Sequence, residues 1–188
     1  MSDLYTQKIE TQRLIITTAR EKYALRLAEY YDKNRTWFDP YEVPKKESYY
    51  TAQYQLSSMQ FEIREMEKHN AMYYYVFLKS EPGRIIGTIS YSRIRQLPYK
   101  STIFGYDFDH DVWGNGYATE ACNATNRQIF DEFQLHRIEA RVSTDNTRSI
   151  KMLERMGFVF EGQEYQSVFI QGAFRDHLRY ALLNHNLL

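Results

Sequence analysis

The stretch Asp109-His-Asp-Val-Trp-Gly-Asn-Gly-Tyr-Ala-Thr119 decides the fold and points to the chemistry. It follows a strand pattern over Ser101–Asp109 and runs into an amphipathic helical pattern over Gly116–Phe133. Gly114 and Gly116 permit positive φ angles and a close approach of the backbone. The free N–H groups of the first helical turn would then converge on one spot that suits a phosphate, although an ordinary strand-to-helix turn shows the same short pattern.

Hydropathy patterns on either side of this stretch predict a mixed α/β fold. We expect further strands at Ile9–Thr18, Met72–Lys79, Arg84–Arg95, Arg137–Ser143, Phe158–Ile170 and Phe174–Leu183. We expect helices at Glu21–Lys33, Ser48–His69 and Thr147–Met156, and a loop at Asn34–Lys46 around two prolines. The chain shows no linker and no repeat, so residues 1–188 are expected to form a single domain.

Composition excludes several classes of protein. The chain has 24 Lys and Arg against 24 Asp and Glu, which argues against a nucleic-acid partner bound by charge alone. Its one cysteine, Cys122, excludes an internal disulfide framework, and the histidines show no metal-ligand spacing, so we expect no metal. No apolar stretch suits a signal peptide or a membrane span, and we expect a cytoplasmic protein that binds no membrane.

The turn around Gly114 and Gly116, called the glycine loop below, fits two known phosphate-binding patterns poorly. The Walker loop needs a Gly, four further residues and then Gly-Lys-Ser/Thr, and that sequence is absent. The dinucleotide fingerprint needs a small residue where Thr119 stands and an acid about 20 residues further on. Glu139 lies inside the next predicted strand, so a nicotinamide cofactor is only weakly indicated.

A family resemblance covers nearly the whole chain. Trp113-Gly-Asn-Gly-Tyr-Ala-Thr-Glu-Ala121 resembles the acetyl-CoA pyrophosphate loop of the GNAT N-acetyltransferase superfamily. The opening Ile9–Ile15, the strand Leu135–Val142 and the segment Asn146–Phe158 resemble its ribosomal-protein N-acetyltransferase (RimJ/RimL-like) branch. The resemblance implies a largely antiparallel central sheet flanked by helices, with acetyl-CoA lying where strands four and five splay apart.

The resemblance also assigns roles to residues. The main chain of Tyr106 and Phe108 would bind the thioester and the pantetheine arm. The pyrophosphate would bind the loop residues Trp113, Gly114, Asn115, Gly116, Tyr117, Ala118 and Thr119. The superfamily pattern has Arg or Gln where this chain has Trp113, so only the main chain contributes at that position.

Three further residues are candidates for catalysis. The resemblance places Asn146 against the coenzyme A arm and makes Ser149 a donor to the departing thiolate, whereas Asp145 or Asn146 could also cap the helix with no catalytic role. Asp107 is a candidate base beside the thioester, or else a solvated strand residue that faces the other way. A protein α-amine has a pKa of about 7.7–8.0, so a strong base is not required.

The acceptor side is expected in the segment Asn34–Tyr54, where the family walls its amine site. Its notable side chains are Arg35, Trp37, Phe38, Tyr41, Tyr49 and Tyr50, and some of these rings are expected to belong to the core. We predict an acetyl-CoA-dependent N-acetyltransferase, a monomer or homodimer, that acts on a protein N-terminal amine. The alternatives are a small-molecule amine acetyltransferase and a catalytically silent acyl-CoA-binding domain.

Overall fold

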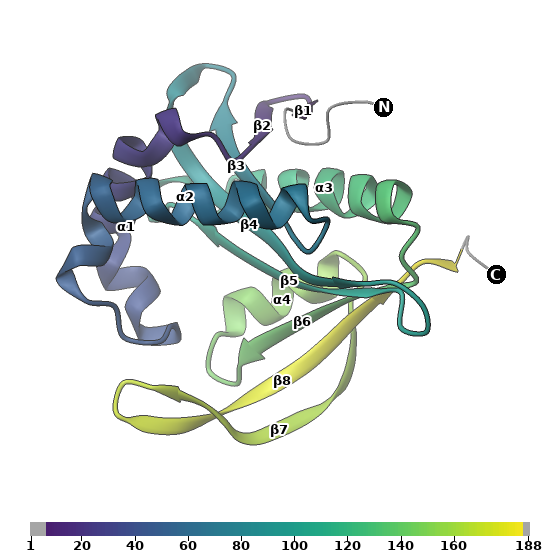
Figure 1. The fold of residues 1–188 in the computed structure, drawn as a ribbon. Helices are drawn as coiled ribbons and strands as arrows, with labels where there is room; N and C mark the ends of the chain where they lie inside the picture. The colour runs from purple at the N-terminus through teal and green to yellow at the C-terminus, as the bar shows by residue number, and fades with distance from the viewer. Residues whose placement is uncertain (1–6, 186–188) are drawn as a thin grey trace.

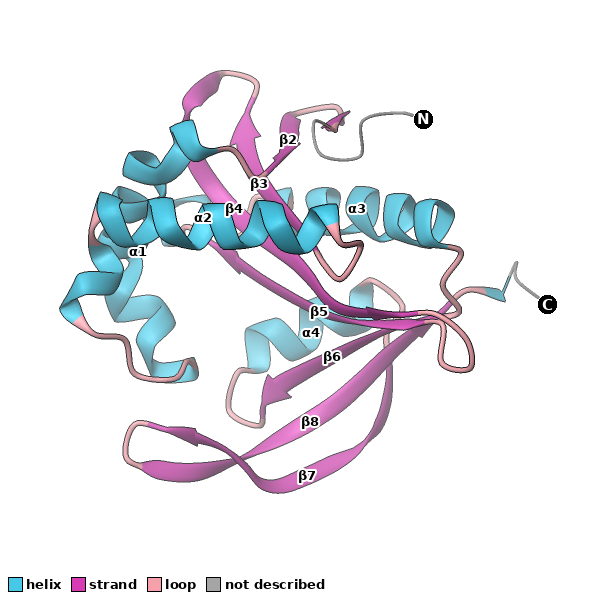
Figure 2. Cartoon of the chain, viewed as in Figure 1, coloured by secondary structure: helices cyan, strands magenta, loops and turns pink. Residues whose placement is uncertain are grey.

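The computed structural model describes residues 7–185 and arranges them as an eight-stranded sheet in the order β1-β2-β3-β4-β5-β6-β8-β7 (Figures 1 and 2). The strands are β1 (Lys8–Glu10), β2 (Leu14–Thr18), β3 (Met72–Leu78), β4 (Glu81–Arg95), β5 (Ser101–Phe108), β6 (Arg137–Ser143), β7 (Val159–Ile170) and β8 (Ala173–Leu183). The helices are α1 (Ala24–Phe38), α2 (Ala52–Glu67), α3 (Tyr117–Phe133) and α4 (Thr147–Arg155). Short 3-10 turns are η2 (Glu21–Tyr23), η3 (Asp39–Tyr41), η4 (Glu47–Tyr50) and η5 (His110–Val112).

The sheet is antiparallel throughout except between β5 and β6, which run parallel because α3 connects them. The predicted mixed α/β fold with a largely antiparallel sheet is therefore confirmed. The parallel pair matters most for function, because α3 starts at the end of β5 and α4 follows β6.

Side chains alternate between the two faces of the sheet, and each face has its own helices. On one face, Tyr75 of β3 donates to Glu62 of α2, and Asp107 lies level with Tyr75 across β4. On the other face, Tyr91 of β4 bonds to Thr125 of α3. Figure 1 shows α2 in front of the strands and α3 behind them. Apolar and aromatic side chains fill both layers and form one continuous core cluster.

Two predicted elements are wrong in detail. Ile9–Thr18 is two strands, β1 and β2, because Thr11 closes a turn in which its main chain and hydroxyl both bond to Leu14. The expected loop at Asn34–Lys46 begins five residues too early, since α1 continues to Phe38. Asn34 is buried inside that helix, where its side chain bonds to the Tyr30 carbonyl at 2.9 Å.

The second helix also begins later than predicted. Residues Glu47–Tyr50 form the η4 turn, and Thr51 caps α2 by accepting the N–H of Tyr54 at 3.3 Å. The other elements lie close to their predicted ranges. Within residues 7–185, every helix is too short or too polar to cross a membrane.

Candidate active site

The parallel strands β5 and β6 separate halfway along their length. Their pairing starts at Ser101 with Arg137 and ends at Phe104 with Ala140. The Asp109 N–H bonds to Ile86 of β4, so by the alternation of a strand the main chains of Tyr106 and Phe108 point away from β4 and into the gap. β5 and β6 therefore splay apart, as the family resemblance implied for its strands four and five. Their separation leaves peptide groups free to bind a ligand.

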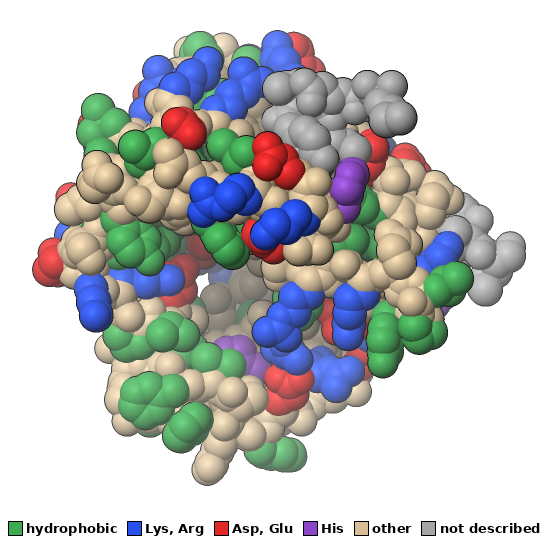
Figure 3. Space-filling view, viewed as in Figure 1, with side chains coloured by type: hydrophobic (Ala, Val, Ile, Leu, Met, Phe, Trp, Pro, Cys, Tyr) green, Lys and Arg blue, Asp and Glu red, His purple; other side chains and the backbone are tan. Residues whose placement is uncertain are grey.

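A cavity of about 520 Å³ occupies this gap. Figure 3 shows the corresponding face hollowed near its centre. Of the residues assigned to the site from the sequence, those that line the cavity are Tyr106, Asp107, Phe108, Trp113, Gly114, Gly116, Tyr117, Ala118, Thr119, Asn146 and Ser149. Asn115 does not line it, because its side chain turns back onto the carbonyls of Val112 and Trp113.

The glycine loop has the conformation that its sequence suggests. Gly114 and Gly116 both have φ of +78°, a value that favours glycine, and a Cβ on Gly114 would meet no atom within 4 Å. Gly116 is the N-cap of α3, and the Glu120 N–H bonds to its carbonyl at 3.0 Å. The N–H groups of the preceding residues in that turn have no helical partner and lie beside the cavity. This arrangement suits an anion.

A buried ion cluster holds the start of this loop. Asp109 is 1% exposed and accepts bonds from Lys33 of α1 at 2.9 Å and from Arg84 of β4 at 2.7 Å. Burial alone would raise its pKa, but the hydrogen bonds from these two cations lower it. The cluster ties β4, α1 and the loop together, so the loop enters α3 at a defined angle.

One wall of the cavity carries a hydroxyl pair. The Tyr106 and Ser149 hydroxyl oxygens are 2.7 Å apart, and burial raises the pKa of the Tyr106 phenol well above its usual value. Asn146 caps α4 by accepting the Ser149 N–H at 3.1 Å. Asn146 therefore has the capping role that the sequence allowed, while the Ser149 hydroxyl is left for the cavity.

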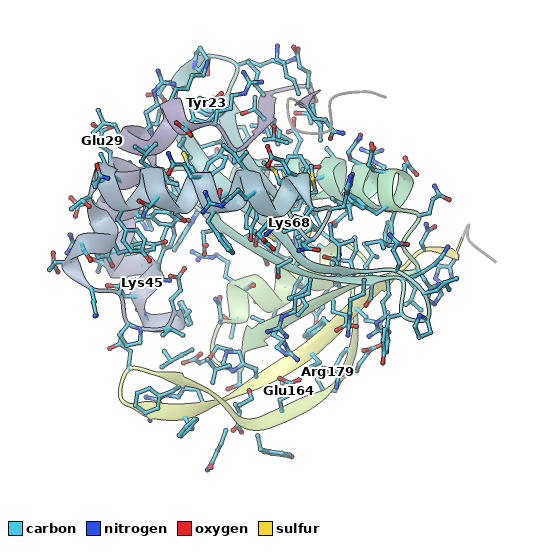
Figure 4. All side chains as sticks on the ribbon, viewed as in Figure 1. Tyr23, Glu29, Lys45, Lys68, Glu164 and Arg179 are labelled. Carbon is cyan, nitrogen blue, oxygen red and sulfur yellow. The ribbon has the colours of Figure 1, made fainter. Side chains whose placement is uncertain are left out.

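Asp107 lies on the opposite face of β5, and one interpretation from the sequence needs correction here. It does not point away into solvent, since it lines the cavity together with Glu42. Burial, and then the charge of Glu42, raise the pKa of Asp107 to about 8. Lys45 and Arg148 oppose this shift only partly. Figure 4 labels Lys45 on the segment that follows α1.

The aromatic segment after α1 divides into a cavity wall and a supporting layer. Trp37, Phe38 and Tyr41 line the cavity, as does Glu42. The other three residues named from the sequence face elsewhere: Tyr49 packs on Tyr31, and Arg35 lies over Tyr50. The tip of the β7–β8 hairpin reaches this wall through a bond from Gln171 to the Asp39 carbonyl at 2.9 Å.

Glu42, Arg148 and His177 are among the cavity residues that were not identified from the sequence. None has a local signal, because an isolated acid, base or imidazole is common on any surface. Arg148 was within the stretch that resembles the family, yet only its neighbours Asn146 and Ser149 had assigned roles. Outside the cavity, Cys122 is buried in α3, and burial raises the pKa of its thiol well above the usual value.

No group of three or more His, Cys, Asp or Glu side chains in residues 7–185 is arranged to hold a metal ion. The cavity itself offers hydroxyls, carboxyl groups and free peptide groups.

Comparisons with known proteins agree with this geometry. The family model described as "Acetyltransferase (GNAT) domain" matches residues 13–159. A curated relative, the [ribosomal protein uS5]-alanine N-acetyltransferase of Escherichia coli, is 30% identical over 176 residues, which cover 93% of this chain and 90% of the relative.

Two solved structures are similar over their whole length. The ribosomal-protein-S5-alanine acetyltransferase from Vibrio fischeri has a TM-score of 0.92 at 28% identity, covering 97% of this chain and 99% of its own. RimJ from Mycobacterium smegmatis, in complex with a CoA disulfide, has a TM-score of 0.91 at 22% identity, covering 100% and 92%. The second similarity shows a shared fold, and that neighbour binds coenzyme A.

Proposed function

Because this chain belongs to the acetyltransferase (GNAT) family, we propose that it transfers the acetyl group of acetyl-CoA to the N-terminal amine of a protein. The observation that carries the proposal is the wedge-shaped gap between β5 and β6, which opens beyond Phe104 and Ala140 and is called the wedge below. It joins free peptide groups, a glycine loop at a helix start, a hydroxyl pair and a carboxyl group in one cavity.

The loop and β5 form the cofactor half of the cavity. The pyrophosphate of acetyl-CoA would accept hydrogen bonds from N–H groups of the loop and the first turn of α3, between Gly114 and Thr119. Its pantetheine arm would pair with the free main chain of Tyr106 and Phe108, as an added strand does. The left-handed glycines support this assignment, because any other side chain at φ +78° would be strained, and glycine lets the loop backbone approach a ligand closely.

The reaction needs a stabilised oxyanion and a leaving thiolate. The amine nitrogen bonds to the thioester carbonyl carbon, the C–S bond breaks, and coenzyme A leaves as a thiolate that takes up a proton. A main-chain N–H in the wedge would stabilise the carbonyl oxygen as it gains charge. Ser149, bonded to Tyr106, is our candidate donor to the sulfur.

Asp107 is our candidate acceptor for the proton that the amine loses. Its pKa of about 8 is close to that of a protein α-amine, about 7.7–8.0. Proton transfer between groups of matched pKa costs little free energy in either direction. A lysine side chain, with a pKa of about 10.4, would lose its proton to this carboxylate far less readily.

The named substrate of the curated relative supports a protein acceptor. A mixed wall of Trp37, Phe38 and Tyr41 beside Glu42 suits a peptide end, whose amine is charged and whose backbone is amphipathic. We propose a cytoplasmic location for an enzyme of this kind. A monomer or homodimer with no nucleic-acid partner stays a prediction.

The test compares two unstructured peptides with acetyl-CoA. One has a free N-terminus and no lysine, and the other has a blocked N-terminus and a single lysine. We expect acetylation of the first peptide at its N-terminus, read by mass spectrometry, and much slower modification of the second. Faster acetylation of the blocked peptide would overturn the N-terminal assignment. Turnover of a small amine with neither peptide modified would favour the small-molecule alternative.

A further inference from the structure

The glycine loop holds three acids and no Lys or Arg between Asp109 and Glu120. The nearby cations are already paired with those acids. Lys33 contacts Asp109 at 2.9 Å and Asp111 at 2.5 Å, while Arg84 contacts Asp109 at 2.7 Å. Arg13 reaches the loop itself, but its guanidinium is taken up by Glu120 at 2.7 Å and by the Asn115 carbonyl at 2.9 Å. A pyrophosphate at this loop would therefore find its local cations committed elsewhere.

Arg148 is the exception. Its guanidinium Cζ lies over the Trp113 ring, 2.9 Å from the ring centroid, and no carboxylate of residues 7–185 is within ion-pair distance of it. Both residues line the cavity that Gly114 and Gly116 also line. Burial lowers the pKa of Arg148, whereas electrostatic attraction to Tyr41, Tyr106 and Asp107 acts to raise it. An unpaired, partly desolvated guanidinium gains most from an anionic partner.

The Trp113 ring is itself held in place. Its Nε1 donates to the Phe108 carbonyl at 2.7 Å, which sets the plane of the ring. His110 packs edge-on against it with ring centroids 4.6 Å apart, and Trp37 stacks on His110 at 3.8 Å. The ring therefore offers Arg148 a fixed platform at the entrance of the glycine loop.

We propose that Arg148 binds the pyrophosphate of acetyl-CoA above the glycine loop, and that the Trp113 ring positions its guanidinium for this contact. The inference rests on the proposed function, since it assumes that acetyl-CoA occupies the wedge. It assigns to α4, a helix on the far side of the wedge, the positive side chain that the loop lacks. The cofactor would then be held from both walls at once.

Other cations of the cavity are less suited to this role. Arg141 is paired with Glu164 at 2.9 Å. Figure 4 labels Glu164 beside Arg179, with which it forms a second, longer contact of 3.8 Å. Arg155 has no ion pair among the described residues, but it lies seven residues after Arg148, about 10 Å further along α4.

The test measures coenzyme A binding by calorimetry. Arg148→Met keeps the aliphatic stem and removes the charge, and we expect the Kd for coenzyme A to rise at least about tenfold, or about 1.4 kcal/mol. Dephospho-coenzyme A lacks the 3′-phosphate but keeps the pyrophosphate, so we expect the same factor with it. Lys151→Met removes a charge from the same helix outside the cavity and should change either Kd less than about twofold.

A double-variant cycle tests the platform. If the Trp113 ring positions Arg148, then Trp113→Leu should weaken binding, and Trp113→Leu combined with Arg148→Met should cost less than the sum of the two single losses. Additive losses would contradict the positioning role. Arg148→Lys should recover only part of the affinity, because an ammonium group does not stack as a planar guanidinium does.

The following results would each overturn the role proposed for Arg148 or the function on which it rests. An unchanged Kd in folded Arg148→Met, or an increase only in acceptor KM, would overturn the assignment of Arg148. A loss seen with coenzyme A and absent with dephospho-coenzyme A would place Arg148 at the 3′-phosphate instead. No coenzyme A binding by the unsubstituted protein would overturn the proposed function itself.

Discussion

The two halves of the cavity are built in different ways. The cofactor half uses main-chain groups from one continuous stretch, from Tyr106 through the glycine loop to the first turn of α3. The acceptor half uses side chains from separate segments: Trp37 from α1, Glu42 after η3, and Asp107 from β5. A contiguous main-chain site leaves a motif in the sequence, whereas a site assembled from distant side chains leaves almost none.

The halves also differ in electrostatics. The cofactor half offers N–H groups and a helix start, which favour an anion. The acceptor half holds Asp107 and Glu42, of which Asp107 has a raised pKa. This division predicts that each half can be damaged without the other, and the following substitutions test it from the largest expected effect to the smallest.

The largest effect is expected from Asp107→Asn, which removes the proposed proton acceptor. We expect kcat/KM at pH 7.5 to fall about a hundredfold, the lower range for loss of general-base catalysis. In the unsubstituted enzyme, kcat/KM should rise with pH and level off above about 8, because the carboxylate accepts a proton only when ionised. The groups that influence Asp107 are Glu42, Lys45 and Arg148, and all are retained in the variant.

Glu62 supplies the matched control, since burial raises the pKa of this carboxyl to about 7 outside the cavity. Glu62→Gln should leave kcat/KM unchanged. A folded-state pKa raised above the unfolded value destabilises the protein as pH rises, because the unfolded chain binds fewer protons. Asp107→Asn should therefore raise Tm at pH 8 more than at pH 4. An equal loss of activity in both variants would contradict the role of Asp107.

Gly116→Asp should most damage the cofactor half. The substitution forces a side chain into φ +78° and adds a negative charge to the loop that is proposed to bind phosphate, with its Cβ 3.5 Å from Arg13 Nη2. We expect the Kd for coenzyme A to rise at least about tenfold, measured by calorimetry. Gly83→Asp introduces the same side chain near the start of β4, where a Cβ meets no atom within 4 Å, and should leave Kd unchanged. Unchanged affinity in folded Gly116→Asp would remove the phosphate loop from the account.

A smaller effect is expected from Ser149→Ala. A free thiol has a pKa near 8.5, so its thiolate gains only modestly from a proton donor, and we expect kcat to fall about fivefold. The Kd for coenzyme A and Tm should change little, because the cap of α4 is the side chain of Asn146. A loss of Tm with normal turnover would assign Ser149 a structural role instead.

The smallest effect is expected from Trp37→Ala on the acceptor wall. Trp37 is 42% exposed, so its removal should raise the acceptor KM only about threefold. The Kd for coenzyme A should change less than about twofold, because the Trp113 ring keeps its Nε1 bond to the Phe108 carbonyl. Tyr54 is similarly exposed and lies outside the cavity, and Tyr54→Ala controls for the loss of a surface ring. Equal changes in acceptor KM in the two variants would exclude Trp37 from the wall.

Most of the fold could be predicted because local patterns report it. The alternation in Arg137–Ser143 matches β6 at both ends, and the glycine pair marks the start of α3. The end of α1 was missed for a physical reason. Asn34 is typical of a loop, but here its side chain bonds to Tyr30 and accepts the His110 N–H at 3.0 Å. The second partner is 76 residues away and invisible to any local pattern.

The candidate site divides in the same way. Of the twelve residues assigned from the family resemblance, eleven line one cavity, all but Asn115. The direction of Asp107 was left open, because a strand pattern does not say which face of the strand lies in a cleft. The partnership of Arg148 with Trp113 joins segments that lie 35 positions apart, and only the folded chain reveals it.

The most direct test of the account is calorimetry of coenzyme A binding to four proteins: the unsubstituted chain, Gly116→Asp, Asp107→Asn and Trp37→Ala. We expect Kd values that agree within about twofold for the unsubstituted chain and the two acceptor-half variants, and a Kd at least about tenfold higher for Gly116→Asp. If the acceptor-half variants lose affinity as strongly as Gly116→Asp, or if the unsubstituted chain does not bind coenzyme A, the division of the cavity into two halves is wrong.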